Sequence, residues 1–115
     1  MKRLNKVYLV FLILFFSMLS FAQRTSEWER LISPTNETLR KLYFVDKNNG
    51  WAVSLGGKII NTIDAGETWH IQNSTVTTPI VDIFFINPNR GWALTYPSEP
   101  PFGTSILKTT NGGLD

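Results

Sequence analysis

Apolar residues form one long run near the N-terminus and only short runs after it. Val7–Phe16 contains ten consecutive apolar residues. Beyond it no 3.6-residue apolar period appears, and short segments rich in β-branched and aromatic residues alternate with clusters of turn-forming residues. This pattern predicts an all-β fold, with strands at 39–45, 51–55, 58–63, 68–72, 80–86 and 92–96.

A repeat with a period of 41 residues organises these strands. Sliding the chain by 41 positions pairs Trp28 with Trp69 and Trp51 with Trp92, and the match from 28–53 onto 69–94 needs no gap. A Gly-Trp-Ala turn occurs in both units, at Gly50, Trp51, Ala52 and at Gly91, Trp92, Ala93.

The period of the repeat and its short strands together predict the architecture. Periods near 40 to 50 residues are typical of solenoids and propellers, and four short antiparallel strands per unit make one propeller blade. We therefore expect an all-β chain of β-propeller blades, with about two blades present, in repeat units of about 28–68 and 69–115. Since Trp28–Ser33 aligns with a fourth strand, the chain is expected to begin with the outer strand of a blade whose other strands lie elsewhere.

The first strand of the first unit is apolar on both faces. Leu39, Tyr43 and Val45 are expected to point one way, and Leu42 and Phe44 the other. A sheet with one wet face alternates more cleanly, so this pattern fits blades that stack face to face.

The two units differ in the hairpin after their second strand. Gly56–Gly57 predicts a two-residue hairpin in the first unit, since glycine adopts positive φ without steric cost. In the second unit a proline-containing insertion adds six residues. Loops on rigid scaffolds often carry binding, so we treat this loop as a candidate contact surface through Tyr96, Glu99 and Phe102.

The segment "TIDAGETW" matches the Asp-box motif of the bacterial neuraminidase repeat. We expect Asp64 to accept backbone N–H bonds from two residues on, and Gly66 to give the turn its backbone freedom. Thr68 is expected to close the hairpin, with the ring of Trp69 packed beneath it. The motif begins at Thr62, and we predict a structural role for all of these residues.

A degenerate second copy lies at the C-terminal end, where Asn111 replaces the aspartate and Gly113 is retained. The chain stops before the matching tryptophan, which predicts a truncated piece of a longer protein with its C-terminal blades missing. Exposed sheet edges would make such a piece prone to aggregate.

Neither copy of the motif offers a convincing catalytic or metal-binding set. Asp64 and Glu67 provide too few oxygen ligands for an EF-hand loop, and His70 is the only histidine in a chain without cysteine. Nothing in the sequence pairs two carboxylates as in a glycosidase. We expect no catalytic residue, no metal and no cofactor.

Residues 1–22 resemble a signal peptide. A basic start precedes the apolar run, and Ser20 and Ala22 suit a cleavage site before Gln23. The alternative is a retained N-terminal anchor, for which the run is short. Cleavage would leave residues 23–115 as one exported domain (periplasmic, cell-surface or secreted) with no stable membrane span.

The leader also explains the charge. Three of the 11 basic residues lie in it, which leaves 8 against 9 acidic residues. The expected mature domain is therefore not basic, and nucleic acid is not predicted as a partner. Without cysteine it must be held together by packing alone.

The stretch "LYFVDKNNGWAVSLGGKIINTIDAGETW" resembles the repeat of the photosystem II stability and assembly factor family. This resemblance covers about Trp28–Asp115 and implies an exported, seven-bladed, non-catalytic propeller. The positions that match are Phe44, Gly50, Trp51, Ala52, Gly57, Ile60, Thr62, Asp64, Gly66, Thr68 and Trp69.

The resemblance favours an exported module that mediates protein–protein interaction or assembly, with a protein partner whose identity stays open. Two alternatives remain. The Asp box also occurs in sialidases, so the chain could be a fragment of a secreted sialidase-like glycoside hydrolase. The product could also be a remnant without function.

Overall fold

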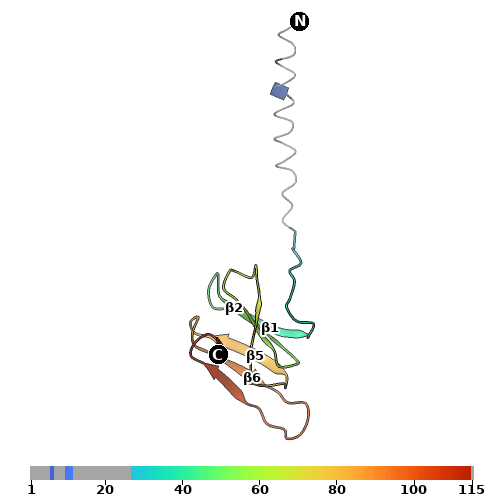
Figure 1. Cartoon of the computed structure of the whole chain (residues 1–115), viewed down its shortest axis with the longest axis vertical. Helices are drawn as coiled ribbons and strands as arrows, with labels where there is room; N and C mark the ends of the chain where they lie inside the picture. Colours follow the sequence, from blue (N-terminus) through green and yellow to red (C-terminus); the bar gives the residue numbers. More distant parts are fainter. Residues whose placement is uncertain (1–5, 7–9, 12–26, 115) are drawn as a thin grey trace. The chain divides into compact units, whose positions relative to one another are not determined.

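The computed structural model describes residues 6, 10–11 and 27–114 (Figure 1). The chain divides into two compact units, Met1–Arg30 and Leu31–Asp115. Lys6, Val10 and Phe11 are helical, and the predicted cleavage site before Gln23 lies outside the described residues. Within the described part of the chain, no helix has the length and apolar character needed to cross a membrane.

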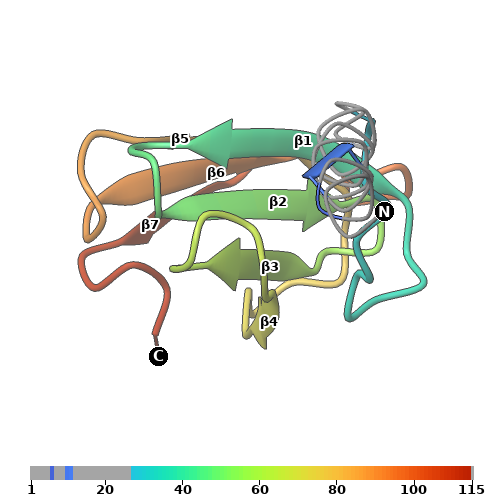
Figure 2. The ribbon, with the colours of Figure 1, turned by 90° about the horizontal axis from the view of Figure 1, so that it is seen from above.

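Two antiparallel sheets make up the described part of the second unit. The first sheet has four strands in the order β1-β2-β3-β4, and the second has three in the order β5-β6-β7. Figure 2 shows β1 of the first sheet beside β5 of the second. The strands are β1 (Leu39–Phe44), β2 (Gly50–Ser54), β3 (Ile59–Thr62), β4 (His70–Gln72), β5 (Ile80–Phe85), β6 (Gly91–Thr95) and β7 (Ile106–Thr109).

These sheets confirm the predicted fold class of antiparallel propeller blades. Each strand pairs with the next one along the chain, and the register of β1 on β2 is reproduced 41 residues later by β5 on β6. Phe44 lies opposite Gly50 in the first pair, and Phe85 lies opposite Gly91 in the second. The sequence repeat is therefore a repeat of strand pairing.

The core lies between the two sheets. It contains Trp51 and Val53 from β2, and its partners from the second sheet are Ile80, Ile83, Phe85 and Ala93. The rings of Trp51 and Phe85 are stacked, with centroids 3.5 Å apart and an interplanar angle of 8°. Such burial of large rings is the main stabilising contribution available to a domain without disulfides.

The prediction that Leu39 shares a face with Tyr43 and Val45 is wrong. Tyr43 and Val45 pack against the core, while Leu39 is exposed and lines a groove with Leu42 on the other side of β1. A register shift between Leu39 and Lys41 is the cause. A β-bulge adds a residue to one strand and so reverses the side to which the preceding residue points.

The prediction of a two-residue hairpin at Gly56–Gly57 is also wrong. Ser54 N donates to Lys58 O at 2.9 Å, so three residues form the loop. Of the two glycines in this hairpin only Gly57 has positive φ, at 89°, which fits a three-residue hairpin that ends in a left-handed residue. A Cβ at Gly57 would lie 2.6 Å from the carbonyl oxygen of Val76.

The segment Trp28–Ser33, which the repeat aligns with β4, forms no strand. The side chain of Trp28 is fully exposed. Among the described residues, the three strands that would accompany it in a blade of its own do not occur.

Candidate functional site

The first Asp box closes the connection between β3 and β4. Asp64 Oδ1 accepts hydrogen bonds from Thr68 N at 2.9 Å and from Thr62 Oγ1 at 2.7 Å, and Asp64 Oδ2 accepts one from Thr68 Oγ1. Gly66 N donates to Thr62 Oγ1 at 2.9 Å. The N–H two residues after the aspartate is thus bound by Thr62, and Asp64 instead reaches the residue four positions on, which differs from the predicted pattern.

The two central residues of this turn are left-handed, with φ of 63° at Ala65 and 91° at Gly66. Trp69 Nε1 donates to Gly66 O at 2.9 Å, and the Trp69 ring meets Phe44 edge to face at 6.0 Å. The tryptophan therefore joins the turn to the first strand of its own blade.

The hydrogen bonds to Asp64 stabilise its ionised form. The Thr68 hydroxyl is the largest cause, followed by the Thr68 backbone N–H and the Thr62 hydroxyl, and together they lower the pKa of Asp64 to about 2. A carboxyl with such a pKa is a poor general acid near neutral pH. The carboxylate oxygens of Asp64 accept the hydrogen bonds that hold the turn.

The second Asp box has the same frame with an amide in place of the carboxylate. Asn111 Oδ1 accepts from Thr109 Oγ1 at 2.9 Å, and from Gly113 N and Leu114 N, both at 3.2 Å. Gly113 N also donates to Thr109 Oγ1 at 2.8 Å. An amide oxygen can accept these bonds, so asparagine preserves the turn without a charge.

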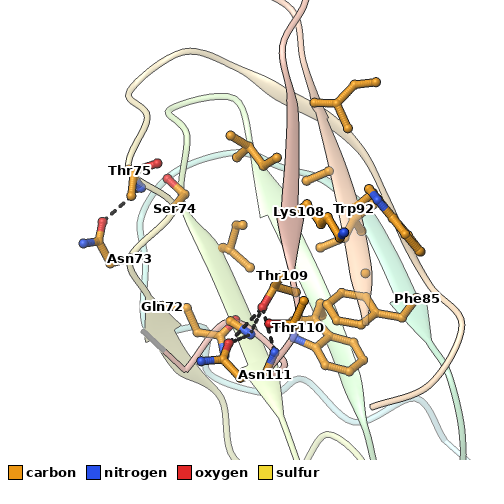
Figure 3. Close-up of a pocket in the computed structure, with 18 residues that line it drawn as sticks. Gln72, Asn73, Ser74, Thr75, Phe85, Trp92, Lys108, Thr109, Thr110 and Asn111 are labelled. Atoms are coloured by element: carbon orange, nitrogen blue, oxygen red, sulfur yellow. Dashed lines mark hydrogen bonds between the residues drawn. The ribbon is translucent and has the colours of Figure 1, made fainter. Parts of the chain in front are cut away.

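The two boxes are placed differently with respect to the core. Trp51 Nε1 donates to Gly112 O at 3.1 Å, and Gln72 Nε2 donates to the same oxygen at 2.9 Å. The second box is therefore fastened to β2 and β4 of the first sheet. Figure 3 shows Gln72, Thr109 and Asn111 among the residues that line a cleft of about 460 Å³ between the two sheets.

The prediction that the two Gly-Trp-Ala segments form turns is wrong, since they are the first residues of strands β2 and β6. In each segment the glycine lies under an aromatic ring of the neighbouring strand. A Cβ at Gly50 would lie 2.7 Å from the Phe44 ring, and one at Gly91 would lie 2.5 Å from the Phe85 ring. The next residue, Trp51, is buried in the core, whereas Trp92 is only partly buried. Ala52 and Ala93 are both buried small residues.

The insertion after β6 forms a loop with a closed base and an exposed tip. Thr95 N donates to Ser105 O at 3.0 Å, and Ser105 N donates to Thr95 Oγ1 at 2.9 Å. Beyond this base Tyr96 is 65% exposed and Phe102 is 73% exposed, and Glu99 is exposed as well. The loop therefore presents two large aromatic side chains to solvent.

The turns after β1 and β5 are held by residues that were not among the predicted site residues. Asp46 Oδ1 accepts from Asn48 N at 2.8 Å and Asn49 N at 2.7 Å, and Asn87 Oδ1 does the same for Asn89 N and Arg90 N. These bonds, that of Asn49 N first, lower the pKa of Asp46. The sequence contains the signal for these turns, since Asp and Asn side chains accept hydrogen bonds from backbone N–H groups two or three residues on.

No protein-family model matches the chain. A segment of 42 residues, 36% of the chain, is 36% identical to the Photosystem II assembly protein Ycf48 of Thermosynechococcus vestitus (strain NIES-2133 / IAM M-273 / BP-1). A solved structure described as YCF48 bound to D1 peptide superposes on 80% of the chain with a TM-score of 0.64 and 27% sequence identity. The resemblance to the photosystem II assembly-factor propellers is confirmed.

The matched regions are small parts of those proteins. The 42-residue segment corresponds to 12% of the Ycf48 relative, and the superposed region corresponds to 28% of the solved chain. The likeness that is shown is therefore to some of the blades of a Ycf48-like β-propeller. Among the described residues there is no group of three or more His, Cys, Asp or Glu side chains that could hold a metal ion.

Proposed function

We propose that this chain is a non-catalytic β-propeller module that binds a peptide segment of a protein partner and so assists assembly. The observation that carries this proposal is the likeness to a propeller that was solved with a peptide bound, at a TM-score of 0.64 and 27% identity. Sequence identity at this level supports a related mode of use as well as a common fold.

The chemistry of the Asp boxes supports a structural role for them. Both carboxylate oxygens of Asp64 accept hydrogen bonds from within the turn, from Thr62 and Thr68. In the second box the equivalent acceptor is Asn111, which carries no charge. A role in proton transfer would need a carboxyl that titrates near the working pH. The comparisons add no support to the sialidase-like alternative.

The loop 96–104 is the surface best suited to contact a partner. Tyr96 and Phe102 expose large rings, and such rings dominate the energetics of protein interfaces. The loop base is fixed by the bonds between Thr95 and Ser105, so the tip is presented from a rigid scaffold.

The binding proposal is tested by fluorescence anisotropy with a labelled D1 peptide as the probe and a peptide of scrambled sequence as the control. We expect the chain to bind the D1 peptide in preference to the scrambled one. The double variant Tyr96→Ala/Phe102→Ala is expected to bind about tenfold more weakly or worse, while its unfolding midpoint stays that of the wild type. Absence of binding, or equal binding of the scrambled peptide, would contradict the proposal.

We further propose that the chain is exported and cleaved before Gln23. The basic start, the short apolar run and the small residues Ser20 and Ala22 support this proposal. N-terminal sequencing of the chain from an exporting host should give Gln23 as the first residue. A product that retains Met1 and partitions with membranes would support the anchor instead.

A further inference from the structure

One end of the two sheets carries three loops that are bonded to one another. They are the hairpin 55–58 between β2 and β3, the connection 73–79 between β4 and β5, and the loop 96–104 after β6. Ser74 Oγ donates to Gly57 O, and Tyr96 N donates to Pro79 O at 2.8 Å. The connection is thereby joined to both other loops, and the three form one continuous surface, which we call the loop-end surface.

Leu55 and Tyr96 occupy the same position in the two repeat units. They are 41 residues apart, and each directly follows the second strand of its own sheet. Leu55 N donates to Thr38 O at 3.0 Å, just before β1. Tyr96 N makes the same bond to Pro79 O, just before β5. The two neighbouring sheets therefore present one apolar side chain each, in the same way, on the loop-end surface.

This position is open to solvent even where a second sheet packs beside it. Leu55 is 43% exposed, although the sheet that carries it is packed on the second sheet through the core. The hairpin extends beyond the ends of the strands, so packing of sheet on sheet does not cover it. The exposed rings of Tyr96 and Phe102 lie on the same surface.

One charge on the loop-end surface has no counterpart. Lys58 Nζ lies 3.5 Å from Glu37 Oε1, so these two charges offset each other. Glu99 is exposed on the loop 96–104 and forms no ion pair with any residue that the structure describes. A segment that complements this surface therefore places a cation near Glu99.

The spacing of the two sheets restricts the backbone conformation of such a segment. Stacked sheets lie about 10 Å apart, so equivalent side chains on the loop-end surface are separated by about that distance. Along one side of a β-strand, side chains follow one another at about 7 and 13 Å. In a polyproline II helix, residues i and i+3 lie on one side about 9 Å apart. Of these two extended conformations, polyproline II matches the spacing of the sheets.

The side chains of the loop 96–104 suit the same conformation. Proline-rich segments bind to surfaces lined by aromatic side chains, and their preformed backbone loses little entropy on binding. Tyr96 and Phe102 provide two exposed rings. The bonds between Thr95 and Ser105 fix the base of the loop that carries them.

We propose that the loop-end surface binds a proline-rich segment of the protein partner in the polyproline II conformation. Two apolar residues of that segment, at i and i+3, contact Leu55 and Tyr96, and a lysine or arginine of the segment meets Glu99. The inference rests on the proposed peptide-binding function. It adds the class of segment that is bound and a contact with the first sheet.

Fluorescence anisotropy with two labelled synthetic peptides tests the spacing. The probe is Leu-Pro-Pro-Leu-Pro-Pro-Arg, with its leucines at i and i+3. The control is Leu-Pro-Leu-Pro-Pro-Pro-Arg, which has the same composition but places the leucines at i and i+2. We expect the chain to bind the probe about tenfold more tightly than the control. Equal affinities for the two peptides would contradict the proposed spacing.

A variant of the first sheet tests whether the segment spans both sheets. Leu55→Ala should weaken binding of the probe about fivefold or more, because it removes one of the two apolar contacts. The matched control is Ile63→Ala, which truncates an exposed apolar side chain at the opposite end of β3. This control should leave the affinity unchanged.

A charge exchange tests the contact with Glu99. Glu99→Lys should weaken binding of the probe about fivefold or more, because two positive charges then face each other. A probe with glutamate in place of its arginine should bind Glu99→Lys more tightly than it binds the wild type. A probe affinity that is the same for wild type and Glu99→Lys would contradict this contact.

Failure of this inference is distinguishable from failure of the proposed function. Binding of the D1 peptide that Leu55→Ala leaves unchanged, with no preference between the probe and its control, would overturn the inference and leave the proposed function standing. Absence of binding of the D1 peptide and of the probe would overturn both.

Discussion

At the scale of single residues, the fold depends on glycines that accept an aromatic ring. Gly91 lies opposite Phe85 in the strand pair, and the other side of the Phe85 ring is stacked on Trp51. The ring therefore has no room to move away from a new methyl group. Gly50 and Phe44 repeat the arrangement in the first sheet.

Gly91→Ala should therefore destabilise the protein by about 1–3 kcal/mol, the usual cost of overpacking a filled core. The matched control is Gly103→Ala, where an added Cβ meets nothing within 4 Å and the change should stay within about 0.5 kcal/mol. Urea unfolding of both variants measures the difference. Equal effects at the two glycines would show that the Phe85 ring is not confined.

Asp64 provides a prediction about pH. Its pKa is lowered from 3.8 to about 2 in the folded state, chiefly by the Thr68 hydroxyl. A lowered carboxyl pKa contributes stability that is present above the unfolded value and is lost as the pH falls through the folded value. The stabilisation by Asp64 should therefore disappear between pH 3.8 and about 2.

Urea midpoints of the wild type and Asp64→Asn, measured at several pH values, test this. Asp64→Asn should lower the midpoint near neutral pH, and the gap should close as the pH falls through that window. Asparagine keeps an amide oxygen, as Asn111 does in the second box, so the variant should still fold. A gap that is independent of pH would contradict the role of the carboxylate.

At the scale of elements, the hairpin between β2 and β3 depends on one left-handed residue. Gly57 has a φ of 89°, and a Cβ there would lie 2.6 Å from the carbonyl oxygen of Val76. Alanine would be disfavoured by its own backbone by about 1–2 kcal/mol, before the contact with Val76 is counted.

Gly57→Ala is accordingly expected to lower the free energy of unfolding by about 2 kcal/mol or more. Chemical denaturation of the purified chain gives this value, with Gly103→Ala as the control for adding a methyl group alone. A loss below about 0.5 kcal/mol would mean that the loop changes its conformation at little cost.

Strands β1 to β6 could be predicted from the sequence because their signal is local and repeated, whereas β7, which follows the proline-containing insertion, was not among the predicted strands. Runs such as "LYFV" and "GWAV" are rich in the β-branched and aromatic residues that favour strands, and the repeat supplies the same signal twice. Only one face of β1 is covered, however, since Leu42 and Phe44 are exposed. The side on which Leu39 lies was not accessible, because a bulge depends on the pairing with β2. The length of the Gly56–Gly57 hairpin was mispredicted since two adjacent glycines do not say which of them is left-handed.

Less of the candidate site than of the strands could be predicted from the sequence. The Asp-box residues were recognised from their motif, but the acceptor for each N–H depends on the closed turn, in which Thr62 binds the N–H of Gly66. The attachment of the second box to Trp51 through Gly112 O is a contact between residues 61 positions apart. No pattern along the chain predicts such a contact.

At the scale of the whole molecule, the two sheets are joined by one core and by polar bonds at its rim. Tyr43 Oη donates to Phe85 O at 2.9 Å, and Trp51 Nε1 donates to Gly112 O. The blades therefore present the loop 96–104 on a packed scaffold. In the proposed function, this scaffold holds a peptide of a protein partner.

Hydrogen exchange monitored by mass spectrometry, with and without the D1 peptide, tests this function. We expect slower exchange in residues 96–104 when the peptide is present, and no such slowing with the scrambled peptide or in Tyr96→Ala/Phe102→Ala. Unchanged exchange throughout the chain at saturating D1 peptide, or protection confined to segments away from this loop, would contradict it.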